Sequence, residues 1–264
     1  VSSQFISGLL FALPLLDGDS RLRLKPPVES RSYIEMTRAS QSRFGVSSAW
    51  LDEYTLAVPG GQAYRPRDMA IEGDWSQVAF PAALGVLAGD VTVTGLEPGT
   101  LQGDAVILDI LRRCGGRAEA VPGGVRFQKS ALHGTKIDLA DCPDLGPILM
   151  ALGLLCEGET VIANAGRLRL KESDRIAAME QELRKLGGQI ESDGGTVTIR
   201  RSVLHAPAGP LWGHNDHRVV MSLTVLAAAA GLPVQIDGAE AVAKSWPGFF
   251  AAVRQLGVEV QTDA

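Results

Sequence analysis

The sequence predicts an α+β fold made of repeated α-β-α-β-β units, an inside-out arrangement with one buried helix per unit and the sheets outside. Three observations predict it. Helix-like segments with a polar first residue recur at intervals of 72, 70 and 72 residues, starting at Ser2, Asp74, Asp144 and Asp216. Amphipathic segments end at glycines spaced by 70, 72 and 70 residues, namely Gly45, Gly115, Gly187 and Gly257. The segments of the first series are apolar nearly all round, which is typical of buried helices.

The other elements of each unit follow in the same order. Strands are expected after the first helices, at Arg21–Lys25, Asp90–Thr94, Thr160–Ala163 and Pro233–Asp237. Second helices are expected before the four glycines, at Tyr33–Phe44, Asp104–Cys114, Glu172–Leu186 and Pro247–Leu256. Gly-Gly turns then predict two hairpins, from Ala118–Ala120 to Val125–Gln128 and from Gln189–Glu191 to Thr196–Arg200.

The two ends of the chain depart from this repeat. The chain starts without the strands that should precede its first helix, and it ends in a segment, Val258–Thr262, that we expect to be the first strand of an unfinished hairpin. The apolar opening has no basic residues and does not resemble a signal peptide. We therefore expect a fragment, or one chain of a split protein whose N-terminal part supplies the partner strand. A natural truncation is the alternative.

Composition excludes several classes of protein. The chain has 264 residues, of which 45% are hydrophobic and 21% charged, as in ordinary globular proteins. Its net charge of −5 argues against a nucleic-acid binder. No apolar run approaches the roughly 18 residues of a membrane span. The irregularly spaced Cys114, Cys142 and Cys156 predict neither a disulfide framework nor a zinc site, and they fit a reducing compartment.

The most highly charged stretch runs from Arg167 to Arg175. If a helix starts near Glu172, its free N–H groups and its dipole favour an anion in front of it. Lys171 and Arg175 would then share one face and could hold a phosphate or carboxylate, with the Glu172 carboxyl group beside it. The alternative is a capped, salt-bridged helix start on the surface.

Other charged residues lie at equivalent places, at or just before helix starts: Asp144, His217, Arg218 and Lys244. Equivalent ends of repeats point to one side, so we expect a cleft that binds an anionic substrate and supports acid–base chemistry. Each residue also has a simpler interpretation. Asp144 could be only a helix cap, Asp216-His217-Arg218 a cap followed by a solvated pair, Lys244 a loop residue, and Ser2-Ser3-Gln4 capping polarity. The cysteines are expected to be packing residues, and His133, His205 and His214 to have surface or turn roles.

Six motifs resemble, in order, those of the 5-enolpyruvylshikimate-3-phosphate (EPSP) synthase family: Ser2-Ser-Gln-Phe5, Glu72-Gly-Asp74, Pro143-Asp144, Leu170-Lys-Glu-Ser-Asp-Arg175, Asn215-Asp-His-Arg218 and Lys244-Ser-Trp-Pro247. The resemblance covers essentially the whole chain. It implies the enolpyruvyl transferase fold, with two domains of three repeats joined by a hinge and substrates bound between them. Residues 1–71 would be one repeat of the shikimate-3-phosphate-side domain. Residues 72–264 would be the second domain, with its last repeat incomplete.

The resemblance also implies the reaction and the site. The family joins the 5-hydroxyl of shikimate 3-phosphate to C2 of phosphoenolpyruvate while C3 is protonated, and the intermediate then loses phosphate. Asp144 would receive or position the hydroxyl proton, Glu172 would protonate C3, and Lys171 would assist. The substrate-binding residues would be Ser2, Ser3, Gln4, Ser30 and Tyr33 for shikimate 3-phosphate, and Arg175, Arg218 and Lys244, with His217 in the same cluster, on the phosphoenolpyruvate side. No metal or organic cofactor is implied, and neither nucleic acid nor membrane is an expected partner.

Two departures from the family pattern matter. Arg167 stands where the family often has asparagine, and the N-terminal motifs that bind both substrates are absent. We therefore expect little or no turnover by this chain without an N-terminal half, present as a separate chain or in an uncut parent. A non-catalytic anion-binding repeat scaffold and a UDP-N-acetylglucosamine enolpyruvyl transferase are the alternative functions. The expected location is the cytoplasm, or the plastid if the source is a plant.

Overall fold

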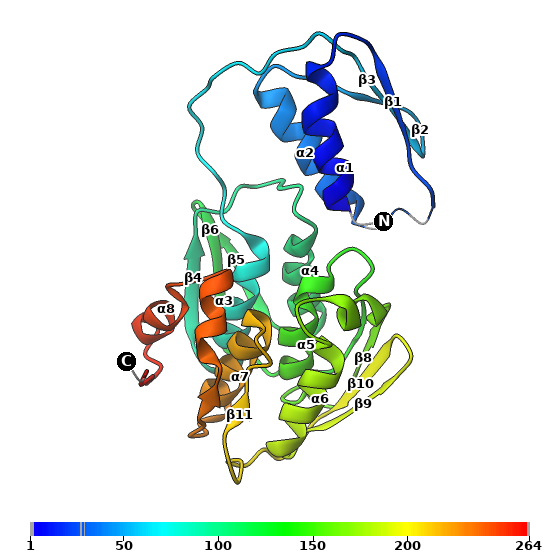
Figure 1. Ribbon diagram of the computed structural model, residues 1–264. Helices are drawn as coiled ribbons and strands as arrows, with labels where there is room; N and C mark the ends of the chain where they lie inside the picture. The colour runs from blue at the N-terminus through cyan, green and yellow to red at the C-terminus, as the bar shows by residue number, and fades with distance from the viewer. Residues whose placement is uncertain (1–2, 27, 29, 263–264) are drawn as a thin grey trace. The chain divides into compact units, whose positions relative to one another are not determined.

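The computed structural model describes residues 3–26, 28 and 30–262, which form two compact units (Figure 1). The first unit comprises Val1–Glu72 together with Gly99–Gly103, and the second comprises Gly73–Pro98 and Asp104–Ala264. By its contacts, the Gly99–Gly103 loop is grouped with the first unit. Over the described residues, no helix has the length and apolar character needed to cross a membrane.

The first unit contains one α-β-α-β-β repeat. Its elements are α1 (Ser3–Ala12), a 3₁₀ turn (Leu13–Leu15), β1 (Ser20–Arg23), α2 (Arg31–Arg43), β2 (Ala49–Asp52) and β3 (Thr55–Val58). The strands form an antiparallel sheet in the order β1-β3-β2, and α1 and α2 lie side by side next to it (Figure 1). A small core joins the helices to the sheet through Ile6, Leu10, Leu24, Ile34, Leu56 and Val58.

The second unit contains three further repeats. The first is α3 (Trp75–Ala88), β4 (Asp90–Thr94), α4 (Ile107–Arg113), β5 (Arg117–Val121) and β6 (Gly124–Gln128). The next is β7 (Lys136–Asp138), α5 (Gly146–Gly153), β8 (Glu159–Ala163), α6 (Arg175–Lys185), β9 (Gln189–Asp193) and β10 (Thr196–Arg200). The last is β11 (Leu211–Trp212), α7 (His217–Ala230), β12 (Ile236–Asp237) and α8 (Phe249–Gln255). The sheets are β4-β6-β5, β7-β8-β10-β9 and β11-β12.

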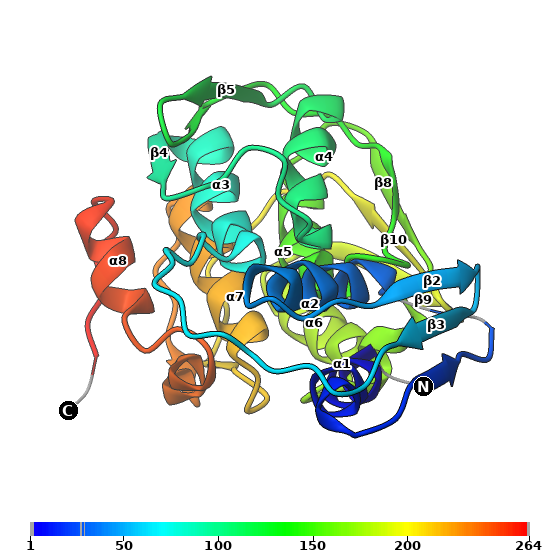
Figure 2. The same cartoon turned by 90° about the horizontal axis from the view of Figure 1, so that it is seen from above.

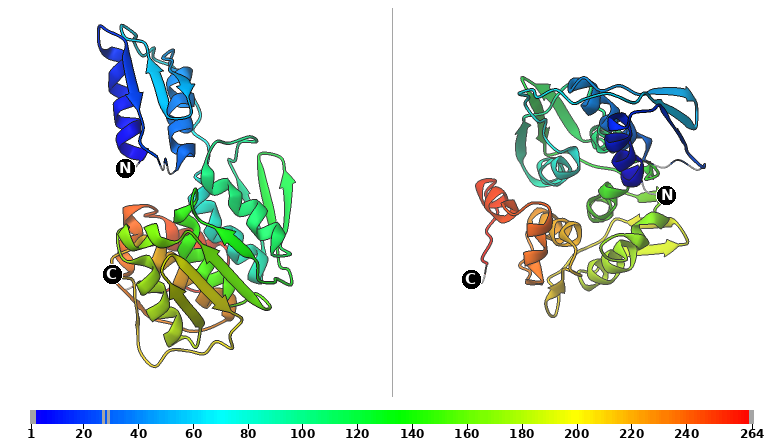
Figure 3. Two further views of the ribbon diagram at one scale, coloured as in Figure 1. Left: turned by 90° about the vertical axis from the view of Figure 1, so that its right-hand side faces the viewer. Right: turned by 45° about the horizontal axis from the view of Figure 1, so that its top comes forward.

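The central helices of the second unit are buried, as the sequence predicted. α3, α5 and α7 contact one another (Figure 2), and every residue of α5 is buried. Sheets β4-β6-β5 and β7-β8-β10-β9 lie on different flanks of these helices (Figures 1 and 3). Apolar faces all round α5 are buried because other helices and sheets surround it. The inside-out α+β repeat fold is therefore confirmed.

Equivalent residues repeat the same local contacts. Gly45, Gly115, Gly187 and Gly257 all have φ between 81° and 87°, the left-handed conformation of a helix C-terminus. An arginine lies three residues before each of the last three glycines. Its guanidinium group donates a hydrogen bond to the carbonyl oxygen of the residue six positions after the arginine. These pairs are Arg112 to Ala118, Arg184 to Ile190 and Arg254 to Val260.

Several predicted elements were wrong in detail. α6 begins at Arg175 rather than near Glu172, because Asp174 caps it and accepts a hydrogen bond from the Ala177 N–H group. The Asp104–Cys114 segment is a 3₁₀ turn (Gly103–Val106) followed by α4. Val258–Thr262 is not a strand, because no strand among the described residues pairs with it. Strands β7 and β11 were not predicted; each is short and pairs in parallel with the strand that follows the next central helix.

Candidate active site

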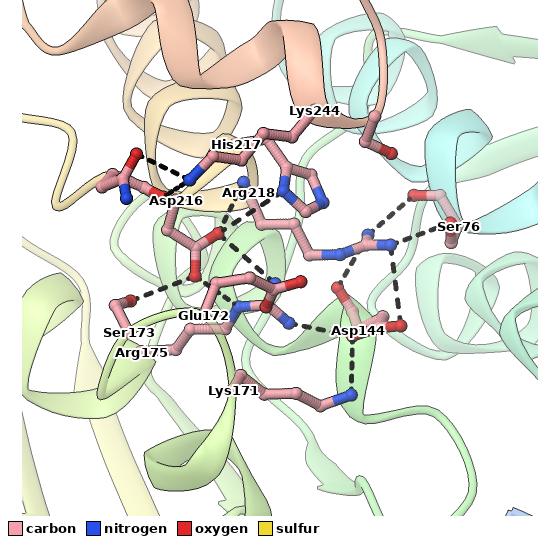
Figure 4. Close-up of polar contacts among 12 residues, drawn as sticks. Ser76, Asp144, Lys171, Glu172, Ser173, Arg175, Asp216, His217, Arg218 and Lys244 are labelled. Carbon is pink, nitrogen blue, oxygen red and sulfur yellow. Dashed lines mark hydrogen bonds and ion pairs between the residues drawn. The ribbon is translucent and has the colours of Figure 1, made fainter. Parts of the chain in front are cut away.

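A cluster of charged side chains lies in the second unit, where the starts of α3, α6 and α7 and the 3₁₀ turn before α5 (Pro143–Leu145) come together (Figure 4). The two lysines of the cluster lie at the ends of two further 3₁₀ segments. Lys171 directly follows the segment Gly166–Leu170, and Lys244 is the last residue of the segment Ala239–Lys244. The repeat therefore does bring Asp144, Lys171, Glu172, Arg175, His217, Arg218 and Lys244 together, as the sequence predicted.

Arg175 is at the centre of this cluster. Its side chain is only 1% exposed, and its guanidinium group donates to three carboxylates. The distances are 2.8 Å from Nε to Asp216 Oδ2, 2.9 Å from Nη1 to Asp144 Oδ1 and 2.6 Å from Nη2 to Glu172 Oε2. Burial alone would lower the pKa of Arg175, but Asp216, Asp144 and Glu172 outweigh that effect and raise it. Arg175 therefore stays charged and fixes three acids around itself.

Asp144 is surrounded by cations rather than used as a helix cap. Besides Arg175, its carboxylate lies 3.3 Å from Lys171 Nζ and 3.6 Å from Arg218 Nη2. Burial would raise the pKa of Asp144, but Arg218, Lys171 and Arg175 together lower it to about 2. No side chain caps α5, so the interpretation of Asp144 as a cap is wrong. The group is ionised at neutral pH and can accept hydrogen bonds.

Arg218 crosses from α7 to the neighbouring repeats. Its Nη1 donates to the carbonyl oxygens of Asp144 at 3.1 Å and Ser76 at 3.4 Å, and its Nη2 donates to Ser76 Oγ at 3.0 Å. Arg218 and His217 are both buried, so they are not the solvated pair that the sequence left open. The guanidinium group is held rigidly on one side of Asp144.

Asp216 does cap α7, and it also supports Arg175. Oδ1 accepts from the Arg218 N–H group at 2.9 Å, while Oδ2 accepts from Ser173 Oγ at 3.0 Å and from Arg175 Nε. Burial would raise the pKa of Asp216, but these bonds, mainly that with Arg175, lower it. One fully buried carboxylate therefore ties the Lys171–Arg175 motif to the start of α7.

The residues before Asp216 hold Lys244. His214 and Asn215 both have positive φ, near 50°, which turns the chain sharply before the helix. Lys244 Nζ donates to the backbone carbonyl and to the side-chain oxygen of Asn215, both at 2.6 Å. Lys244 is thus anchored beside the Asn-Asp-His-Arg motif instead of being an unattached loop residue.

His217 is buried, and its Nδ1 atom has no hydrogen-bond partner among the described residues. Burial, and then the neighbouring Arg218, lower the pKa of this histidine. His217 is therefore neutral at pH 7 and leaves the cationic charge of this side to Arg218 and Lys244.

The residues expected to bind shikimate 3-phosphate lie in the first unit. Ser3 is buried at the start of α1 and Gln4 is exposed next to it, while buried Ser30 and half-exposed Tyr33 lie at the start of α2. One turn further on, Ser7 Oγ and Thr37 Oγ1 are 2.7 Å apart, which fixes the alignment of the two helices. The helix starts therefore lie at the same end of this unit (Figure 1). Ser2 lies outside the described residues.

Sequence reasoning missed three residues at the cluster: Ser76, Ser173 and Asp104. Ser76 and Ser173 are ordinary first-turn residues in the sequence, and only the fold shows their bonds to Arg218 and Asp216. Asp104 is 5% exposed, and its Oδ1 atom has no partner among the described residues. Burial, then the charge of Asp144, raises the pKa of Asp104 to about 7.

Arg167, whose substrate contact the sequence left in doubt, donates to the Ala140 carbonyl at 3.5 Å.

Metal-binding residues do not gather in the described part of the chain. Over residues 3–26, 28 and 30–262, no group of three or more His, Cys, Asp or Glu side chains could hold a metal ion. Cys114, Cys142 and Cys156 are buried free thiols. Nδ1 of His133 and of His205 lies near the carbonyl of the following residue, which agrees with turn roles.

Comparison with solved structures identifies the class of fold. The fold is that of the enolpyruvyl transferases. EPSP synthase from Acinetobacter baumannii aligns with a TM-score of 0.84 at 22% identity, covering all of this chain and 62% of that one. The enolpyruvyl transferase NikO from Streptomyces tendae aligns with a TM-score of 0.74 at 19% identity, covering 94% of this chain and 57% of that one.

Sequence comparison gives the family. The chain belongs to the EPSP synthase (3-phosphoshikimate 1-carboxyvinyltransferase) family, whose sequence profile matches residues 1–253. It is 40% identical over 260 residues to the 3-phosphoshikimate 1-carboxyvinyltransferase of Clostridium kluyveri, covering 98% of this chain and 61% of that protein. The protein of the same name from Methanothrix thermoacetophila is 42% identical over 270 residues, covering 99% and 61%. The chain thus spans about 60% of the length of these relatives.

Proposed function

We propose that this chain carries the second-domain part of a site that transfers the enolpyruvyl group of phosphoenolpyruvate to the 5-hydroxyl of shikimate 3-phosphate and releases phosphate. One observation carries the proposal. Buried Arg175 holds Asp144 and Glu172 within hydrogen-bond distance of one guanidinium group, beside Lys171 and Arg218. Two acids held among fixed cations suit proton transfer next to an anionic substrate. The names of the relatives, 3-phosphoshikimate 1-carboxyvinyltransferase, support the substrate.

In this proposal the two acids have different roles. Ionised Asp144 receives or positions the proton of the 5-hydroxyl as its oxygen bonds to C2 of phosphoenolpyruvate, while Glu172 protonates C3 and Lys171 assists. The Glu172 carboxylate then takes a proton back from C3, the bond from C2 to the phosphate oxygen breaks, and phosphate leaves. A pKa near 2 keeps Asp144 ionised at neutral pH, so it can accept a hydrogen bond from the 5-hydroxyl and position it, but it also makes the carboxylate a weak base, which favours positioning over proton transfer. The side chain of Glu172 is 44% exposed, which is consistent with a proton donor that reaches substrate.

The cations bind the anionic groups in this proposal. Arg218 and Lys244 contact phosphoenolpyruvate, with His217 beside them, and Ser2, Ser3, Gln4, Ser30 and Tyr33 contact shikimate 3-phosphate. Arg175 joins the phosphoenolpyruvate contacts when the anion replaces Glu172 at Nη2, which also frees the Glu172 carboxyl group. Preorganised cations stabilise the departing phosphate without reorganisation during the reaction.

We further propose that turnover needs an additional N-terminal segment, supplied by a separate chain or by an uncut parent. Two observations support this. The relatives extend well beyond the matched region. In addition, α1 exposes apolar side chains, including Phe5, Leu9 and Phe11, whereas the equivalent helices α3, α5 and α7 cover one another. We expect the complete protein to act in the cytoplasm, or in the plastid if its source is a plant; buried free thiols are compatible with a reducing compartment.

The experiment is calorimetric titration of the purified chain with shikimate 3-phosphate, followed by a phosphate-release assay with phosphoenolpyruvate added, and both are repeated after adding a separately expressed N-terminal segment of the Clostridium kluyveri relative. Binding and phosphate release only after mixing would support both parts of the proposal. Phosphate release should then be lost in Asp144→Ala and kept in Glu191→Gln, a control on the exposed face of β9. Turnover by the 264-residue chain alone would refute the need for a second segment. No binding in either case, from folded protein, would refute the transferase.

A further inference from the structure

The first turn of α3 contacts both elements that carry the cations Arg218 and Lys244. Ser76, buried in that turn, accepts from Arg218 Nη2 at 3.0 Å through its hydroxyl and from Nη1 at 3.4 Å through its carbonyl. The next residue, Gln77, donates from Nε2 to Ser245 Oγ at 2.5 Å. Ser245 directly follows Lys244. Two successive residues of one helix thus reach two separate parts of the cluster.

The repeat explains why this turn is in place. Asp74 caps α3 by accepting from the Ser76 N–H group at 2.8 Å, and Asp216 caps α7 by accepting from the Arg218 N–H group at 2.9 Å. Ser76 and Arg218 are therefore equivalent residues of two repeats, each two positions after its capping aspartate. Because both helix starts are fixed by their caps, the short hydroxyl of one and the long guanidinium of the other meet across the unit.

We propose that Ser76 and Gln77 are positioning residues, which hold Arg218 and the Lys244 loop at the spacing needed to bind the carboxylate and phosphate groups of phosphoenolpyruvate. The proposal rests on the proposed function for the identity of the anion. An arginine can rotate about its long side chain, and two bonds to Ser76 together with one to the Asp144 carbonyl restrict that rotation. Rigid placement lowers the entropic cost of binding an anion.

The test compares Ser76→Ala with Ser222→Ala. Ser222 is also buried and lies on α7 one turn after Arg218, but its Oγ has no hydrogen-bond partner within the described residues. Phosphoenolpyruvate is titrated by calorimetry into each variant after mixing with the N-terminal segment of the Clostridium kluyveri relative. Loss of one hydrogen bond to a charged group should weaken binding about tenfold in Ser76→Ala and leave Ser222→Ala unchanged. Gln77→Ala should also weaken binding, and equal binding by all three variants would overturn the proposal.

A second measurement does not depend on ligand. The ¹⁵N–¹H signals of the Arg218 guanidinium group, assigned by their absence in Arg218→Lys, should be separate and slow to exchange in the unaltered chain. In Ser76→Ala these signals should merge into averaged ones, because the Arg218 guanidinium group is then freer to rotate. The thermal unfolding midpoints of Ser76→Ala and Ser222→Ala should stay similar. Unaltered Arg218 signals in Ser76→Ala would refute positioning. If Arg218→Lys mixed with the N-terminal segment binds phosphoenolpyruvate normally, or the unaltered chain mixed with that segment does not bind it, the anion site of the proposed function fails, and these signals still decide the role of Ser76.

Discussion

Partly buried Asp144 and buried Asp104 are two carboxyl groups whose pKa values are shifted in opposite directions. Three cations outweigh the burial of Asp144 and lower its pKa to about 2, whereas burial and the nearby negative charge of Asp144 raise that of Asp104 to about 7. One group therefore stays ionised and the other takes up a proton near neutrality. The difference arises because Lys171, Arg175 and Arg218 lie within ion-pair distance of Asp144, whereas burial is the largest effect on Asp104 and outweighs the cations there.

Asp144 should stabilise the fold above about pH 4 and lose that effect as the pH falls toward 2. Its pKa is lower in the folded than in the unfolded chain, so protonation favours unfolding in that interval. The effect is about 2 kcal/mol, from a shift of roughly 2 pH units. Urea unfolding of Asp144→Asn between pH 7 and pH 2.5 should show a shallower loss of stability in acid than the unaltered chain. Asp109→Asn, an exposed change on α4, is the control and should behave like the unaltered chain.

Asp104 should have the opposite effect at higher pH. Its pKa is higher in the folded chain, so its contribution is present below about pH 4 and is lost as the pH rises through 7. The expected loss is up to about 4 kcal/mol, from a shift of roughly 3 pH units. Asp104→Asn, which cannot ionise, should therefore be more stable than the unaltered chain at pH 8 and no more stable at pH 4. Equal stability of the two proteins at pH 8 would show that Asp104 is not the protonated group.

At the scale of the element, the helix-ending glycines differ in what surrounds them. Gly187 and Gly257 both have a φ of 87°, but a Cβ atom at Gly187 would lie 2.9 Å from His205 Cδ2, whereas none of the described atoms lies within 4 Å of one at Gly257. A left-handed non-glycine residue costs about 1–2 kcal/mol by itself. Any further cost at Gly187 comes from the contacts with the His205 ring and with the Val203 carbonyl oxygen, which would lie 3.1 Å from the Cβ atom.

Gly187→Ala should therefore destabilise the second unit by more than the roughly 1–2 kcal/mol expected from its backbone conformation alone. In a His205→Ala background the same change should cost less, because the ring is gone and only the contact with the Val203 carbonyl oxygen remains. Denaturant unfolding of the two single variants and the double variant measures the coupling between the sites. Strictly additive effects of the two substitutions on the free energy of unfolding would contradict a steric contact between the Cβ atom at position 187 and the His205 ring.

Elements of this protein could be predicted from sequence where a local signal marks their ends. The glycines that end second helices need left-handed backbone, and β4 has the predicted bounds, Asp90–Thr94, between a helix end and a glycine. The start of α6 was wrong because Lys171 and Glu172 have the composition of a first turn, although Asp174 is the better cap. Short strands such as β7 have no periodicity to detect, and pairing alone defines them.

The sequence was enough to predict which site residues lie close together, but not which of them form hydrogen bonds with one another. Equivalent positions in a repeat predicted that Asp144, Arg175 and Arg218 would meet. The three acids of Arg175, however, come from positions 3, 31 and 41 residues away, and Ser76 is 142 residues from Arg218. No local pattern encodes such contacts. They follow from the packing of α3, α5 and α7, which brings the capped helix starts together.

At the scale of the whole molecule, the two units have separate cores of very different size. Among the described residues, the core cluster of the first unit has six buried members, including Leu10, and the second unit is built around three central helices, including α5 with Leu149. Small domains bury a smaller fraction of their surface and are correspondingly less stable. Because α1 also exposes Phe5, Leu9 and Phe11, the first unit should be the weaker of the two.

Thermal unfolding of the chain should therefore occur in two steps, with the first unit melting at the lower temperature. Truncating a buried leucine costs about 2–5 kcal/mol in the core that contains it. Leu10→Ala should lower only the first midpoint and Leu149→Ala only the second, as followed by calorimetry together with hydrogen exchange at the amides of α2 and α7. Adding the N-terminal segment proposed above should raise the first midpoint alone, since it would cover α1. A single transition that both substitutions lower equally would contradict independent units, and would mean that the two cores unfold as one.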